Sequence, residues 1–260
     1  MSHFTQETAA LTRRWILRTK AEGGALVLGL FQPLIWLMLF GHMFGRVAGW
    51  QPKAFGTDNY LAFQTGGIIA FTILNNALMG AVPLLFDREN GYLYKLLAAP
   101  ISRTALLLSR FVYVTVFSLV QAALILTCAV FLGVTIAQGV LGVAKIMLAG
   151  LLLCFGFTLL SIALVFIFPG HAAFFTVIGF VMTPILLLSD ALMPLAAMPD
   201  WLQWLALANP LTHAVALMRP AVISASGGDT RTTCIAIAYL IAFDLAMLGL
   251  AVAVVRRKTE

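Results

Sequence analysis

Long apolar runs separated by short polar segments are the dominant pattern of this chain of 260 residues. A helix needs about 20 consecutive apolar residues to cross the hydrocarbon core of a bilayer. The runs lack the period-two alternation of a barrel, and backbone groups in lipid must be hydrogen-bonded within their own segment, so we expect helices. We predict an all-α integral membrane protein with six transmembrane helices, at residues 25–44, 60–86, 104–134, 143–168, 172–192 and 233–255.

A further apolar segment, residues 198–224, is long enough to cross the membrane but contains several polar residues. Its middle holds Asn209 and Pro210, and Arg219 follows them. Proline restricts the residue before it and donates no hydrogen bond, so this dipeptide favours a turn. Two tryptophans near the start of the segment suit the membrane–water boundary. We therefore expect two short helices that enter the outer leaflet and return, an extracellular re-entrant segment before the last span.

The lysines and arginines predict the orientation of the six spans, because cytoplasmic loops are enriched in these residues. Six spans put both termini and the loop 87–101 on one side, with five of the 16 basic residues on the other side. A seventh span would move the basic C-terminal end outside. We therefore expect both termini in the cytoplasm, on the side that holds the other eleven basic residues: Arg13, Arg14, Arg18, Lys20, Arg88, Lys95, Arg103, Arg110, Arg256, Arg257 and Lys258.

The composition agrees with a membrane protein and argues against several other classes. Hydrophobic residues make up 62% of the chain and charged residues 10%, whereas soluble domains carry about a quarter charged residues. The net charge of +6 does not indicate nucleic-acid binding, because the basic residues cluster at the ends of apolar runs. The chain lacks a phosphate-binding loop, a zinc-protease motif, a nucleophile elbow and paired cysteines. We expect no enzyme, no metal site and no cofactor in this chain.

Residues 4–22 precede the first span and are predicted to form an amphipathic helix on the membrane surface. Phe4, Leu11 and Trp15 fall on one face, at spacings of seven and four residues, and basic residues fall opposite. Two further apolar residues blur this pattern, so a solvated N-terminal arm is the alternative interpretation.

Polar residues deep within the predicted spans are candidates for function, because they are costly in lipid. Asn75 and Asn76 lie near the middle of the second span, where they either line a substrate path or hydrogen-bond another helix. For Gln121, in the third span, we favour a hydrogen bond between helices. Asp244 lies near the middle of the last span; a proton relay would need several partners, so a structural pair is the expected role.

The window from Phe86 to Arg103 is the most charged part of the chain, with five charged residues in 18. Within it we predict a short helix, with Gly91 near its start, Pro100 at its end and leucines on one face. This helix is too short to cross the membrane and too charged to be buried. It suits a groove in a soluble partner, and an ordinary solvated turn is the alternative.

In order and spacing, these features resemble the membrane subunit of an ABC-2-type ABC transporter. The matching pieces are residues 87–91 (DRENG), residues 96–103 (LLAAPISR) and residues 209–212 (NPLT) leading to Arg219. The resemblance covers nearly the whole chain. It implies an exporter of a prokaryotic inner membrane that works with a separate ABC ATP-binding subunit, which holds ATP and Mg, and with a second membrane subunit, most simply as a homodimer.

The resemblance also implies roles for particular residues. Asn209, Pro210 and Arg219 would form an outer gate. The second and fifth spans would face each other, so the candidates for the substrate path or the dimer interface are Asn75, Asn76 and Pro184. The first cytoplasmic loop would be the coupling helix that contacts the ATP-binding subunit, and its candidate residues are Asp87, Arg88, Glu89, Gly91, Leu93, Tyr94, Lys95 and Leu97.

We expect the cargo to be an amphiphilic small molecule, a lipid or a lipid-linked glycan. The alternative function is a secondary transporter or channel without an ATPase partner. Such a protein needs a coupling-ion site near the bilayer midplane, where Asp244 is the one acidic residue so deeply placed.

Overall fold

The computed structural model of the chain describes residues 2–21, 24–50, 57, 59–92, 103–168, 170–223 and 229–259. Within these ranges the chain is almost entirely helical, and no strand occurs in them. The helices, in chain order, are α1 (Ser2–Ala21), α2 (Ala25–Trp50), α4 (Tyr60–Met79), α5 (Val82–Glu89), α7 (Arg103–Phe131), α8 (Gly139–Ile167), α9 (His171–Leu187), the 3-10 helix η1 (Leu195–Ala197), α10 (Asp200–Leu207), α11 (Pro210–Ile223) and α12 (Thr230–Thr259).

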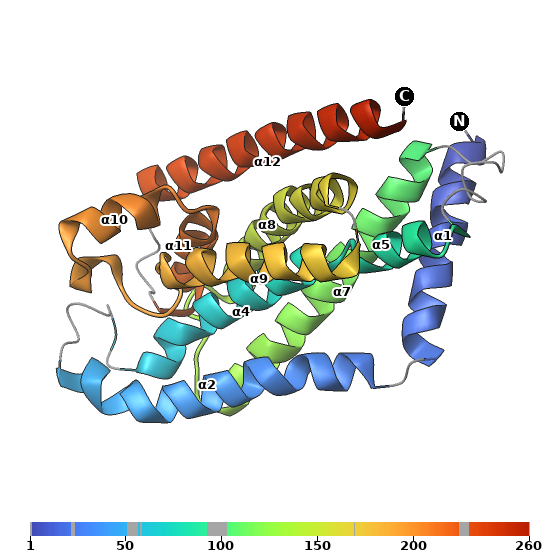
Figure 1. The fold of residues 1–260 in the computed structure, drawn as a ribbon. Helices are drawn as coiled ribbons and strands as arrows, with labels where there is room; N and C mark the ends of the chain where they lie inside the picture. Colours follow the sequence, from blue (N-terminus) through green and yellow to red (C-terminus); the bar gives the residue numbers. More distant parts are fainter. Residues whose placement is uncertain are drawn as a thin grey trace.

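The two termini lie at the same end of the molecule, together with α5, whereas α10 and α11 lie at the opposite end (Figure 1). We name these the termini end and the α10 end. The long helices run back and forth between the two ends. Residues 87–89, at the end of α5, therefore lie at the same end as both termini.

Five helical stretches in the described ranges are long and apolar enough to cross a membrane, and they correspond to five of the six predicted spans. The predicted span 172–192 corresponds to α9, which is apolar but has only 17 residues. The predicted end of this span is wrong: α9 ends at Leu187, because Ser189 and Asn209 side chains donate to the last carbonyls of the helix. The five stretches are Leu28–Gly45, Tyr60–Glu89, Leu108–Phe131, Gly139–Ile167 and Thr230–Arg257.

The predicted span 60–86 consists of two helices rather than one. α4 ends at Met79 and α5 begins at Val82, with a turn between them. Pro83 lies in the first turn of α5, where a residue without an N–H is tolerated because the first N–H groups of a helix have no intrahelical partner. The proline therefore belongs to the start of a new helix, at the termini end of the molecule.

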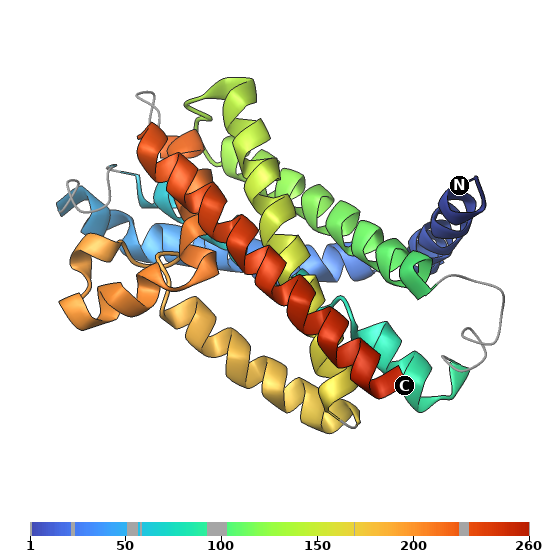
Figure 2. The same cartoon turned by 90° about the horizontal axis from the view of Figure 1, so that it is seen from above.

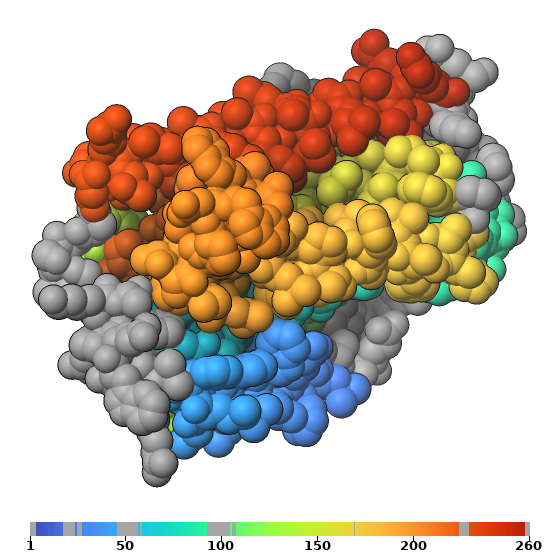
Figure 3. Space-filling model, turned by 60° about the vertical axis from the view of Figure 1, so that its left-hand side comes forward, coloured from blue at the N-terminus to red at the C-terminus, as the bar shows by residue number. Residues whose placement is uncertain are grey.

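α4 is the central helix of the fold. Most of its residues are buried, and it packs against α2, α7, α8 and α11. α12 packs along α8 on the outside of this group (Figure 2). α9 is peripheral: its buried residues are Phe174 and Ile178, and it lies on the face of the molecule between α2 and α12 (Figure 3).

α1 packs against α7 through the face that was predicted to lie on the membrane. Leu11 and Trp15 are buried, and the guanidinium of Arg110 on α7 lies 4.2 Å from the centroid of a Trp15 ring. Ile16 and Leu17 are exposed instead. The apolar face of α1 is therefore partly a contact between helices, and its position on the membrane surface stays a prediction.

Candidate functional site

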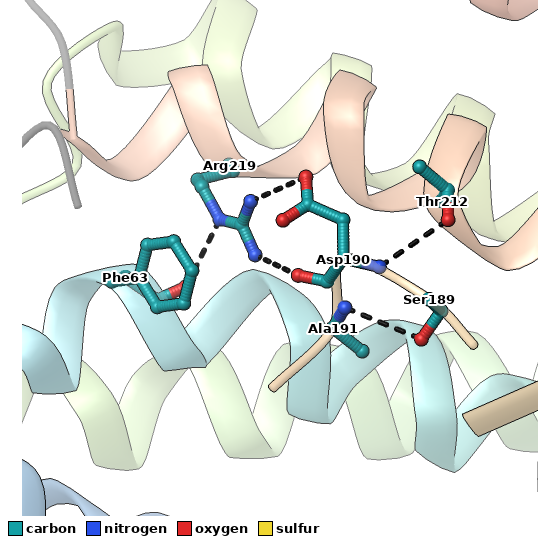
Figure 4. A network of polar contacts seen from close by, with 6 residues as sticks. All are labelled: Phe63, Ser189, Asp190, Ala191, Thr212 and Arg219. Atoms are coloured by element: carbon teal, nitrogen blue, oxygen red, sulfur yellow. Dashed lines mark hydrogen bonds and ion pairs between the residues drawn. The ribbon is translucent and has the colours of Figure 1, made fainter. Parts of the chain in front are cut away.

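Arg219, which the sequence singled out, is the centre of a polar network at the α10 end (Figure 4). Its Nη1 lies 2.7 Å from Oδ2 of Asp190, and its Nη2 donates to the backbone carbonyl of Asp190. Its Nε donates to the Phe63 carbonyl at 3.3 Å, and its guanidinium lies 3.7 Å from the centroid of the Phe63 ring. The backbone N–H of Asp190 donates to Thr212 Oγ1 at 3.3 Å. We name Phe63, Asp190, Thr212 and Arg219 the Arg219 network.

The ion pair of this network is largely shielded from solvent, since the side chains of Arg219 and Asp190 are 13% and 11% exposed. Burial raises the pKa of Asp190, and the charge of Arg219 acts in the opposite direction. All three guanidinium nitrogens have an oxygen partner. The fixed fork of arginine suits this arrangement, in which one cation joins α4, α11 and the segment after α9.

Gly67 brings the backbone of α4 against the segment after α9. A Cβ atom at this position would lie 2.1 Å from the carbonyl oxygen of Ala191. The next closest atoms are also backbone atoms of Ala191, so no side-chain rotation relieves the contact. Sequence reasoning missed both Asp190 and Gly67. The sequence did offer one signal for the ion pair: Asp190 is an acidic residue at the end of an apolar run, and a buried carboxylate requires a basic partner.

Asn209, the second residue predicted for the outer gate, joins the end of α9 to the start of α11. Its Nδ2 donates to the carbonyls of Ile185 and Leu188, both at 2.7 Å. Its Oδ1 accepts from the N–H of Leu211 at 3.0 Å. Pro210 is the first residue of α11, a position that suits proline. The helical stretch breaks between α10 and α11 at this dipeptide, and the re-entrant arrangement of the two short helices stays a prediction.

Asn209→Ala is expected to lower the free energy of unfolding by about 1–3 kcal/mol, because two partly buried carbonyls lose their donors. Asn209→Asp keeps the acceptor for Leu211 but sets a carboxylate against the same carbonyls, so it should be no better than alanine. Thermal unfolding in detergent would measure both. Asn59→Ala is the matched control, since Asn59 caps only the start of α4 and its loss should cost about 1 kcal/mol. An aspartate variant as stable as the wild type would contradict the assigned donor role.

Asn76 and Gln121 hydrogen-bond each other between α4 and α7, with Asn76 Nδ2 2.6 Å from Gln121 Oε1. This confirms the bond between helices predicted for Gln121. Asn75 points elsewhere: it lines a cavity of about 20 Å³ beside α2, with Gln32 and Trp36 among its other lining residues. Pro184 lies half-buried within α9. The cavity is of the size of one water molecule, and the role of Asn75, Asn76 and Pro184 in a substrate path or dimer interface stays a prediction.

The predicted coupling loop, residues 87–101, is described up to Tyr92, and Leu93, Tyr94, Lys95 and Leu97 lie outside the described residues. Asp87, Arg88 and Glu89 form the last turn of α5. Arg88 Nη1 donates to the Val165 carbonyl of α8 at 2.6 Å. Gly91 ends this turn with φ of +72°, a backbone conformation that favours glycine.

Asp244 is buried on α12 beside α8, where a Cβ on Gly156 would lie 2.5 Å from its Oδ1. Within the described ranges no basic side chain forms an ion pair with it, so the predicted structural pair is not found there. No group of three or more potential metal ligands occurs among the residues that the structure describes.

These features define the class of the protein: a multi-pass helical membrane protein, with a shielded polar network at one end and a charged helix terminus at the other. The chain matches the family model described as ABC-2 type transporter over residues 6–223. It is 40% identical over 216 residues to the "Putative transport permease ycf38" of Pyropia yezoensis, covering 81% of this chain and 72% of that protein.

More distant relatives carry more specific names. The chain is 26% identical over 223 residues to "Nodulation protein J" of Sinorhizobium fredii, covering 84% of this chain and 82% of that protein. It is 25% identical over 229 residues to the "Daunorubicin resistance ABC transporter permease protein DrrB1" of Streptomyces coeruleorubidus, covering 86% of this chain and 78% of that protein. The chain belongs to the ABC-2 type transporter family, as a transport permease, the non-enzymatic membrane subunit of an ABC transporter.

Proposed function

We propose that the chain is the permease of an ATP-driven exporter, and that α5 and the segment after it receive the motion of a separate ATP-binding subunit. The observation that carries this proposal is the position of the charged end of α5, which lies with both termini and opposite the Arg219 network. In this proposal α9 is a sixth crossing, the termini are cytoplasmic, and the membrane is a prokaryotic inner membrane. The Arg219 network then lies at the outer end of the path, as its gate.

A second membrane subunit, most simply another copy of this chain, completes the proposed transporter. The face of α2 supports this arrangement, since only 11% of its apolar stretch Leu28–Gly45 is buried within the chain. Gln32 is exposed on α2 next to the cavity of Asn75, and an amide is costly against lipid. A second subunit or a water-filled path beside Gln32 removes that cost.

The proposed cargo is an amphiphilic small molecule, a lipid or a lipid-linked glycan. Apolar helix surfaces and uncharged amides such as Asn75 and Gln32 suit a molecule with an apolar body and hydrogen-bonding groups. The relative named for daunorubicin resistance supports a small molecule within this group.

Affinity purification of the tagged chain from its own host in mild detergent, followed by mass spectrometry, tests the proposal. We expect an ABC ATP-binding protein to co-purify, and the complex to hydrolyse ATP in a vanadate-sensitive reaction. The ATP and Mg of the proposal are held by that partner. A folded chain that repeatedly purifies without any ATPase would contradict the proposal and favour a secondary carrier, with Asp244 as its first candidate residue.

A further inference from the structure

The hydrogen bonds that join α9 to other elements of the described chain lie at its two ends. Along its length it buries two residues, Phe174 and Ile178. At its last turn, Asn209 donates to the carbonyls of Ile185 and Leu188. The residues that follow α9 belong to the Arg219 network, where Asp190 pairs with Arg219. A displacement along α9 therefore acts directly on that network.

The other end of α9 is capped by Glu89, the last residue of α5. The backbone N–H of His171, the first residue of α9, donates to Oε1 of Glu89 at 2.7 Å. The Nδ1 of His171 lies 3.2 Å from both carboxylate oxygens. The N-cap residue, Gly170, supplies no side-chain cap. A carboxylate from α5 thus satisfies an N–H that the helix itself leaves without a partner, and the positive end of the helix dipole favours its charge.

Two further contacts hold α5 to the same corner of the molecule. Arg88 donates to the Val165 carbonyl near the end of α8. The ring of Phe86 lies 6.3 Å from the ring of His171, with an angle of 28° between the planes. The last turn of α5 therefore contacts both the end of α8 and the start of α9. Within this turn, Glu89 accepts the hydrogen bond from the backbone N–H of α9.

We propose that Glu89 is a positioning residue that acts through α9. Its bond to the His171 N–H makes α5 and α9 move together, so that motion at the termini end reaches the Arg219 network at the α10 end. The helix spans about 26 Å at 1.5 Å per residue, which makes it a second connection between the two, beside α4, which carries Phe63 and continues into α5. This inference rests on the proposed coupling to an ATPase and deepens it: Glu89 acts within this chain, on α9.

His171→Pro removes the N–H that Glu89 binds and leaves the helix intact. Proline suits the first position of a helix, and the extended ψ of 154° at Gly170 is compatible with a following proline. His171→Ala is the matched control, because it loses the ring and keeps the N–H. Glu89→Ala removes the acceptor from the other side, and Glu89→Gln retains an oxygen that accepts the same bond.

The measurement is the labelling rate of Met193→Cys by a maleimide in the purified complex with its ATPase, with the three native cysteines replaced. Met193 is 48% exposed and follows the Arg219 network. We expect ATP with vanadate to change this rate by about fivefold, a usual size for coupling between two sites. The change should persist in His171→Ala and Glu89→Gln, and be lost in His171→Pro and Glu89→Ala. The ATPase should remain bound to His171→Pro, because His171 is not among the residues predicted to contact it.

The outcomes separate this inference from the function on which it rests. A local role of Glu89 in helix stability would alter labelling equally with and without ATP, and the response to ATP would persist. An undiminished response in His171→Pro therefore overturns the inference alone. If the folded chain that carries Met193→Cys binds no ATPase, the proposed function is overturned, and the inference with it.

Discussion

Asp190→Ala is expected to lower the free energy of unfolding by about 3–5 kcal/mol, the usual result of leaving one member of a buried ion pair alone. The substitution leaves the guanidinium of Arg219 shielded from water beside Phe63 with its strongest partner removed. The two carbonyl oxygens that Arg219 also binds do not neutralise its charge. Thermal or denaturant unfolding of the purified protein in detergent would measure the loss.

Two companion variants distinguish the ion pair from a general effect of mutation at this end of the molecule. The double variant Asp190→Ala with Arg219→Leu should recover much of the lost stability, because no buried charge remains. Arg219→Lys keeps the charge but lacks the fork that binds three oxygens, so it should be clearly less stable than the wild type. A double variant as unstable as Asp190→Ala would show that the stranded charge is not the cause.

Gly67→Ala is expected to have the second large effect, since its new methyl group would lie 2.1 Å from the Ala191 carbonyl oxygen. The two backbones have to separate, which typically costs about 1–3 kcal/mol or more in a packed interior. The separation would also pull Asp190 away from Arg219. We therefore expect a lower unfolding temperature.

The matched control is Gly249→Ala on α12, where a Cβ meets nothing within 4 Å. In a helix this change usually stabilises by up to about 1 kcal/mol, so the two glycine variants should shift the unfolding temperature in opposite directions. Equal shifts would contradict the close approach of α4 to Ala191. The same detergent and assay must be used for both, since the comparison depends on the sign.

The spans were predictable because their signal is local. Five predicted crossings correspond to long apolar helices, and a run of about 20 apolar residues needs no knowledge of its neighbours. The predicted end of the fifth span was wrong because residues 188–192 are on average apolar enough to extend a span, whereas α9 ends at Leu187. Their departure from the helix depends on Asn209, a residue from a later segment of the chain.

The partners of the candidate residues were less predictable than the residues themselves. Arg219 attracted attention as a charge within an apolar segment, but its partner Asp190 is 29 residues away. Glu89 was assigned to a contact with another protein, and its bond to His171 crosses 82 residues. Gln121 was expected to bond another helix, and the structure supplies the partner as Asn76. A single sequence shows which groups need partners, whereas the pairing depends on how the helices pack.

The contact between Trp15 and Arg110 has a consequence for biosynthesis. The two residues are 95 positions apart, so at about 5–20 residues per second the ribosome needs several seconds to deliver α7 after α1. During that interval α7 is not yet available to α1, and two hydrophobic helical stretches, Leu28–Gly45 and Tyr60–Glu89, have already been synthesised. The N-terminal helix therefore completes its docking late, after the segments that follow it have been made.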